Sequence, residues 1–201
     1  MQTRRRVGRI LIVFGMCLVF AALGIFIYNE YESRRAESRS REEAERLKAE
    51  INERSKEQSR GSAEDKQDEG KNSESRDDID ETYIGIITIP AIGVEAPVTS
   101  EYNEETLKQM PCRYYGSADE GNLVIAGHNY RHGFGELNSL SEGDEVMLTE
   151  TDGNIRHYVV KEREVLKEDD VKGMNESGWE LSLYTCTYSG RERLTIRCRE
   201  E

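Results

Sequence analysis

Near its C-terminus the chain reads Leu183-Tyr184-Thr185-Cys186-Thr187-Tyr188-Ser189-Gly190-Arg191-Glu192-Arg193-Leu194-Thr195-Ile196-Arg197-Cys198. Two alternating stretches flank Ser189-Gly190, a turn dipeptide, and this pattern predicts a β-hairpin. With the turn centred on that pair, Cys186 faces Arg193, with both side chains on the same side of the sheet. The same register gives the hairpin a core face made of Leu181, Leu183, Leu194 and Ile196. A thiol beside a guanidinium on the other, polar face marks a candidate site for chemistry.

The N-terminal part of the 201-residue chain has the pattern of a membrane anchor. Residues 10–28 carry no charged side chain, which is long enough for a helix that crosses a bilayer. Four arginines precede this stretch and the first acidic residue is Glu30, so the positive-inside rule predicts a cytoplasmic N-terminus (residues 1–9) and an extracellular remainder. A cleaved signal peptide is the alternative, but its apolar region would be unusually long, and no small-x-small site closes it cleanly. We therefore predict a single-pass plasma-membrane protein.

The segment after the anchor is highly charged. The chain has a formal net charge of −12, and this acidic balance argues against nucleic acid and against adhesion to an anionic membrane surface. Residues 29–80 are dominated by Glu, Arg, Lys, Ser, Gln and Asp, which predicts a spacer that is helical in its first half and disordered from about residue 61. Leu47 and Ile51 are its only substantial apolar pair, so an oligomerising stalk is the less favoured alternative.

Residues 81–201 are the predicted catalytic domain. Short β-branched stretches separated by turns, at this length, predict a mostly β fold, a small closed or half-open barrel with short helices. Asp152-Gly153 predicts a second hairpin turn, and residues 104–110 predict a helix with Asn103 as its N-cap. Cys112 follows Pro111 and is expected to be a free thiol in a loop. The predicted strands are 83–90, 94–99, 122–126, 145–148, 156–166 and the two arms of the Cys186 hairpin.

The second chemical element is the segment from Gly121 to Tyr130. Its apolar strand runs into Gly127, and His128 stands at the C-terminal end. Small residues on both sides let other backbone approach closely there, so this histidine is placed to enter a cleft. A lone histidine is more often structural or merely exposed. Together with a cysteine beside an arginine, it predicts a thiolate nucleophile, a proton donor and an oxyanion ligand.

In this order the motifs resemble those of the sortases, the cell-wall transpeptidases of Gram-positive bacteria. Ser182-Leu183-Tyr184-Thr185-Cys186 resembles their Thr-Leu-x-Thr-Cys signature, with Ser in place of the first Thr. Residues 122–128 resemble the strand that delivers their catalytic histidine, and residues 193–196 resemble the segment that delivers their arginine. The start of the predicted domain, residues 84–90, also resembles the opening of theirs. The resemblance covers essentially all of residues 81–201 and implies a sortase-like barrel.

The resemblance also implies a mechanism. Cys186 attacks the threonine carbonyl of a C-terminal sorting signal of the Leu-Pro-x-Thr-Gly kind on a surface protein, and His128 protonates the leaving amine. Arg193 stabilises the oxyanion or positions the substrate. A lipid-linked cell-wall precursor or a pilin lysine supplies the amine that resolves the thioacyl intermediate. Arg191 falls on the same predicted face as Arg193, and the apolar residues after Arg193 favour the latter.

Substrate contacts and cofactors are less defined by the sequence. Thr185, next to the nucleophile, and Trp179, in the stretch where sortases carry a substrate-facing loop, are the candidate substrate-binding residues. We predict no metal and no cofactor. No acidic cluster establishes a calcium site, which leaves calcium dependence and the sortase subclass open. His128 and His132 have helical metal-ligand spacing, but the glycine that follows argues against a helix there.

Two other functions fit parts of the pattern. An exported cysteine peptidase acting on cell-wall peptides would also use Cys and His, but in the common families Cys precedes His, often at a helix start. A non-catalytic, membrane-tethered binding domain would make Cys186 incidental. It predicts that an alkylating reagent labels Cys186 no faster than Cys112.

Overall fold

The computed structural model describes residues 2–61, 82–130 and 133–201, and the chain divides into two compact units, Met1–Arg35 and Ala36–Glu201. The first unit is the N-terminal part of helix α1 (Gln2–Gly61). Its large apolar side chains from Phe14 to Tyr28 are exposed, as expected for a helix surrounded by lipid. By length and composition this helix could cross a membrane, in agreement with the predicted anchor. Its orientation stays a prediction.

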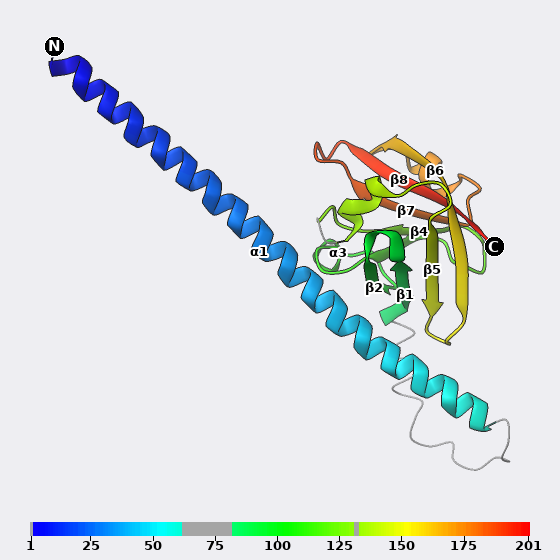
Figure 1. Cartoon of the computed structure of the whole chain (residues 1–201). Coiled ribbons are helices and arrows are strands. Elements are labelled where there is room, and N and C mark those ends of the chain that lie inside the picture. The colour runs from blue at the N-terminus through cyan, green and yellow to red at the C-terminus, as the bar shows by residue number, and fades with distance from the viewer. Residues whose placement is uncertain (1, 62–81, 131–132) are drawn as a thin grey trace. The chain divides into compact units, whose positions relative to one another are not determined.

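The second unit contains a closed β-barrel (Figure 1). Among the described residues, eight strands follow one another around it in the order β1-β2-β3-β4-β7-β8-β6-β5. The pairs β2–β3 and β4–β7 are parallel, and the other neighbours are antiparallel. The prediction of a small β-barrel is confirmed, and the barrel is closed. The strands are β1 (Tyr83–Ile89), β2 (Val94–Thr99), β3 (Cys112–Tyr115), β4 (Leu123–Ala126), β5 (Glu145–Glu150), β6 (Ile155–Lys167), β7 (Leu181–Cys186) and β8 (Glu192–Glu200).

Both predicted hairpins form, and the β7–β8 hairpin has the predicted register. In the β7–β8 hairpin Cys186 pairs with Arg193, and a hydrogen bond of 3.0 Å from the Thr187 amide to the Glu192 carbonyl closes its end. In the β5–β6 hairpin Met147 pairs with His157, on either side of the predicted Asp152-Gly153 turn. In the β7–β8 hairpin, alternation on both arms together with the turn dipeptide therefore predicted the strand register correctly.

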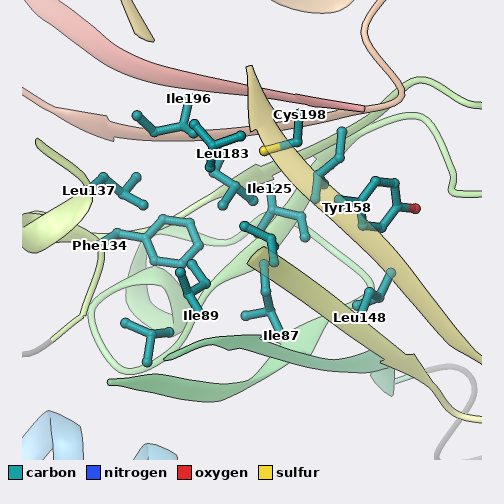
Figure 2. Close-up of a cluster of buried hydrophobic side chains, with 14 of the residues drawn as sticks. Ile87, Ile89, Ile125, Phe134, Leu137, Leu148, Tyr158, Leu183, Ile196 and Cys198 are labelled. Atoms are coloured by element: carbon teal, nitrogen blue, oxygen red, sulfur yellow. The ribbon is translucent and has the colours of Figure 1, made fainter. Parts of the chain in front are cut away.

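The barrel interior is filled by side chains of alternate strand positions (Figure 2). The core face predicted for the hairpin is correct, because Leu181, Leu183, Leu194 and Ile196 belong to this cluster. Phe134 and Leu137 enter it from η2 (Phe134–Ser139), a short 3-10 helix between β4 and β5.

Two short segments between β2 and β4 differ in how well they were predicted. Helix α3 (Glu104–Leu107) begins where expected, and the Asn103 side chain accepts a hydrogen bond of 2.8 Å from the Glu105 amide. The expectation that Cys112 lies in a loop is wrong. Cys112 starts strand β3, pairs with Ala126 of β4, and is fully buried.

The C-terminal half of α1 belongs to the second unit. Leu47 and Ile51 are 2% and 4% exposed and pack with Ile86 of β1 and with Tyr83. Tyr83 also donates a hydrogen bond of 3.1 Å to Glu43. The apolar pair that favoured an oligomerising stalk only weakly therefore packs against the barrel within this unit. The predicted boundaries of the spacer and the domain stay predictions, and residues 62–80 of the spacer lie outside the described residues.

Candidate active site

Three adjacent strands, β4, β7 and β8, bring the predicted catalytic residues to one end of the sheet. Cys186 is the last residue of β7 and pairs with Arg193 of β8. On the other side of β7 runs β4, in parallel, with Ala126 paired with Tyr184. His128 follows Ala126 by two residues and Cys186 follows Tyr184 by two. Equal steps along parallel strands therefore carry the imidazole and the thiol to the same edge.

The chain around His128 is tightly packed. A Cβ on Gly127 would lie 2.3 Å from the Phe134 ring, so only glycine lets this ring cover the strand end just before the histidine. The His128 ring stacks on Tyr130, with centroids 4.0 Å apart and planes at 24°. These contacts fix the ring at the end of a rigid strand. The predicted close approach at this glycine is made by an aromatic side chain rather than by backbone.

A cavity of about 540 Å³ lies on the histidine side of the site. His128, Tyr130 and Phe134 line it, together with residues of α1 that include Ser40 and Arg41. Cys186 and Arg193 do not line it. The hollow is therefore adjacent to His128 and does not surround the Cys186 thiol.

The described cysteines of the barrel differ sharply in accessibility. Cys186 is half-buried, whereas Cys112 and Cys198 are both 0% exposed. Burial raises the pKa of the Cys198 thiol to about 12. Of the three described barrel cysteines, Cys186 is therefore the one whose thiol solvent can reach.

The arginine side chains at the hairpin end have different surroundings. The Arg193 guanidinium donates hydrogen bonds of 3.0 and 3.2 Å from Nη1 to the carbonyls of Gly190 and Glu192. Arg191 is more exposed and lies in the turn, where its carbonyl accepts a bond of 3.2 Å from the Glu168 amide. Arg193 is thus the arginine of the hairpin that lies in register with the thiol and is held in place by local carbonyl groups.

Next to the thiol, the outer face of the barrel carries an aromatic and apolar cluster that sequence reasoning missed. Tyr184 packs edge-on against Tyr114 with ring centroids 5.3 Å apart, and Tyr114 packs in the same way against Tyr102 at 5.6 Å. Burial raises the pKa of Tyr102, and Glu104 and Cys186 raise it further. Tyr184 lies two residues before Cys186 on the same strand, so the sequence could have placed it on the same face. The two other tyrosines come from the β2–β3 connection and from β3, which sequence reasoning did not place. The cluster consists of Val124, Ala126, Met174 and Tyr184, with Leu107, Tyr114 and Leu166 packed against it.

The structure does not bring the two predicted substrate-binding residues to this cluster. Thr185 is 2% exposed and pairs with Leu194, a residue of the barrel interior. Trp179 lies beneath Arg199, whose guanidinium carbon is 4.2 Å from the ring centroid. It precedes Leu181, at the opposite end of β7 from Cys186. Substrate binding by these two residues stays a prediction.

One residue of the histidine pair that the sequence offered as metal ligands is not described by the structure. His132, considered with His128 as a metal pair, lies outside the described residues. Elsewhere, in the part of the chain that the structure describes, no group of three or more His, Cys, Asp or Glu side chains is arranged to hold a metal ion.

Comparison with known proteins identifies the family. The sortase domain matches residues 87–201, more than half of the chain, and the chain therefore belongs to the sortase family. Among curated proteins, none matches the sequence.

Solved structures agree with this assignment. Sortase E from Streptomyces avermitilis is 29% identical, with a TM-score of 0.51, over 60% of this chain and 89% of that one. A Clostridium perfringens sortase D5 transpeptidase has a TM-score of 0.60 at 20% identity, over 82% and 99% of the two chains. Sortase A from Corynebacterium diphtheriae has a TM-score of 0.52 at 24% identity over 60% of this chain, which spans 61% of that structure. The latter two likenesses, at low identity, concern the fold.

Proposed function

We propose that this protein is a membrane-anchored cysteine transpeptidase. In this proposal it cleaves a sorting signal of the Leu-Pro-x-Thr-Gly kind on a surface protein and joins the new carboxyl end to an amine. The observation that carries the proposal is the row formed by the ends of β4, β7 and β8, which bear His128, Cys186 and Arg193.

The proposed chemistry has two steps that balance in protons. The Cys186 thiolate attacks the threonine carbonyl carbon, and the oxyanion that forms accepts hydrogen bonds from Arg193. When the threonine–glycine bond breaks, the leaving nitrogen takes a proton from the imidazolium of His128, which leaves a thioester on Cys186. An incoming amine then attacks this thioester and gives a proton back to His128. The thiolate leaves, and an amide bond replaces the one that was broken.

Several features of the molecule support these roles. Cys186 is the accessible barrel thiol, and Arg193 is its cross-strand neighbour, with a guanidinium oriented by turn carbonyls. Tyr102 and Tyr114, which are partly exposed and pack edge-on in series against the buried Tyr184, offer an extended peptide an aromatic surface beside the thiol. An apolar helix at the N-terminus would hold the enzyme at the surface where secreted proteins and cell-wall precursors meet.

We propose a primary amine as the acceptor, without assigning it to one of the two sources. A cell-wall precursor and a pilin lysine both present a primary amine, and either would resolve the thioester. One similar structure is described as a pilus-related sortase C of Group B Streptococcus, at 22% identity, a likeness that concerns the fold. Incubating the enzyme with a sorting-signal peptide and each amine in turn, followed by mass spectrometry of the product, distinguishes the two acceptors.

The decisive experiment traps the intermediate. Cys186→Ala should abolish both peptide cleavage and amine transfer, whereas Cys112→Ala and Cys198→Ala should leave the chemistry largely intact. In the wild type, an acyl group should be found on the peptide that contains Cys186. An acyl group on another cysteine would refute the assignment, and cleavage with water in place of every amine would favour the peptidase.

The arginine variants test the oxyanion role. Losing an oxyanion donor costs ~10²–10³ in rate, so Arg193→Ala should lower kcat/KM by at least that factor. Arg193→Lys should recover little, because an ammonium lacks the guanidinium fork. Arg191→Ala is the matched control and should keep most of the activity. If Arg191→Ala were the inactive variant, the assignment of Arg193 would fail.

A further inference from the structure

Arg197 of β8 is a buried charge away from the proposed catalytic row. Its side chain is 1% exposed, although its strand alternation puts it on the outer face of the barrel, with Arg193 and Thr195. An isolated buried guanidinium is costly, so the surrounding groups must compensate it. One compensating group is the carboxylate of Glu164 on β6, which accepts a bond of 2.5 Å from Nε. Another is the Ser182 hydroxyl on β7, which accepts one of 2.7 Å from Nη1.

The remaining hydrogen bonds all go to one segment, the connection between β6 and β7. Nη2 donates to the Gly173 carbonyl at 2.7 Å, and Nη1 donates to the Met174 carbonyl at 3.3 Å and to the Ser177 hydroxyl at 3.1 Å. Gly173 and Met174 are in the last turn of helix α4 (Val171–Asn175), where carbonyl groups have no partner within the helix. A guanidinium there satisfies these carbonyls and complements the negative end of the helix.

The segment held in this way covers the strands that bear the catalytic residues. The Met174 side chain is 5% exposed and packs on Val124, Ala126 and Tyr184. Two of these residues lie on β4, shortly before His128, and Tyr184 lies two residues before Cys186. A five-residue helix has little stability of its own, so its position over this face depends on tertiary contacts.

We propose that Arg197 is a positioning residue that holds α4 against β7 and β8, so that this helix, seated on the sheet through the buried Met174, forms a fixed wall beside Cys186. The kinetic part of this inference rests on the proposed function. Its structural part, the fixing of α4 by a cross-strand guanidinium, does not. Arg197 touches neither the thiol nor the imidazole, and its effect should reach substrate binding through the position of α4.

Two kinds of measurement test the inference on the full-length chain in detergent. The first is hydrogen exchange followed by mass spectrometry, which needs no activity. In Arg197→Met, amides of residues 171–177 should exchange at least about 10-fold faster, while those of β1 and β2 keep their rates. Arg163→Met is the matched control. Arg163 is exposed on β6, and its guanidinium donates a bond of 2.7 Å to the carbonyl of Asn138 in η2, outside the connection between β6 and β7. Unchanged exchange in residues 171–177 would overturn the inference.

The second measurement is kinetic, with a sorting-signal peptide at saturating amine. Arg197→Met should raise KM for the peptide roughly 10-fold and change kcat by less than about threefold, because binding is impaired and the catalytic row is intact. The KM of Arg197→Lys should lie between those of the wild type and Arg197→Met. A lysine ammonium can keep the ion pair with Glu164 but cannot bridge to all the carbonyl groups. Equal losses in kcat for both variants, or an unchanged KM, would refute the positioning role.

A third variant covers the possibility that the arginine substitutions unfold the barrel. Ser177→Ala removes a contact on the α4 side and leaves the buried charge with its other partners. It should loosen residues 171–177 and raise KM about two- to threefold, with no change in thermal midpoint beyond a few degrees. An inactive wild-type enzyme with the expected exchange pattern would contradict the proposed function but keep the structural role of Arg197. An active wild type whose Ser177→Ala variant shows neither effect would contradict the positioning role alone.

Discussion

Alkylation of the native protein tests the accessibility of its thiols, and the structure sets the expected rates. We expect iodoacetamide at about pH 8 to modify Cys186 and to spare Cys112 and Cys198. Both spared residues are 0% exposed, and the Cys112 thiol donates to the Met110 carbonyl at 3.6 Å. Burial also raises the pKa of Cys198 from 9.0 to about 12, which lowers its thiolate fraction about 1000-fold.

The buried thiols can react only when the barrel opens. For an opening free energy of at least ~5 kcal/mol, the open fraction is below about 10⁻³. Cys112 and Cys198 should therefore be labelled at least about 1000-fold more slowly than Cys186. Peptide mapping by mass spectrometry at several reaction times gives the rate at each cysteine, and labelling in strong denaturant provides the control in which the three rates converge. Native rates for Cys112 or Cys198 within about tenfold of Cys186 would refute the burial that we describe.

This experiment also changes what labelling can say about function. The binding-domain alternative predicts that Cys186 reacts no faster than Cys112. Because Cys112 is buried in β3, burial alone gives Cys186 the faster rate, even if it has no catalytic role. Labelling therefore tests the fold, and trapping of the acyl intermediate tests the nucleophile.

Three further predictions concern stability. Leu47→Ala should lower the free energy of unfolding by ~2–3 kcal/mol and the thermal midpoint by roughly 5–10 °C, measured by circular dichroism; an unchanged midpoint would mean that α1 contributes no core contact. Gly127→Ala should destabilise the barrel by at least ~2 kcal/mol, because its Cβ would collide with the Phe134 ring; a wild-type urea midpoint would contradict that packing. Stability should also fall as the pH rises from about 9 towards 12, because burial raises the pKa of Cys198 and of Tyr83 to about 12 and the unfolded chain loses these protons first; a urea midpoint that is flat across this window would argue against it.

The pairing of Cys186 with Arg193 was accessible to sequence reasoning because it depends on local rules. The turn at Ser189-Gly190 and the alternation on both arms define the pairing of Cys186 with Arg193. Strand β3 escaped prediction for the opposite reason. Residues 112–115 form only four positions after a proline, and their pairing with β2 and β4 involves partners distant in sequence.

The use of Leu47 and Ile51 was equally hard to foresee. Two apolar residues in a highly charged stretch cannot form a coiled coil, and this reasoning was sound for the isolated segment. Their partner is Ile86, which the sequence presents as one of several core residues of a strand. A short apolar stripe on a helix becomes informative only when the surface that receives it is known.

The connection between β6 and β7 shows how a long-range contact decides which residue of a loop packs beside the strand end that bears Cys186. Trp179 was the candidate there, because it lies in the stretch where sortases carry a substrate-facing loop. It lies next to the start of β7, however, while Cys186 lies at the end, so the length of the strand separates them. Met174 is further from Cys186 in sequence, yet α4 folds back over the sheet and brings it onto Tyr184. That return is held by Arg197, whose alternation with Arg193 suggested only another polar side chain on an open face. A charge on the uncovered face of a hairpin and a charge beneath a helix have the same sequence pattern, and the covering helix determines which of the two the protein contains.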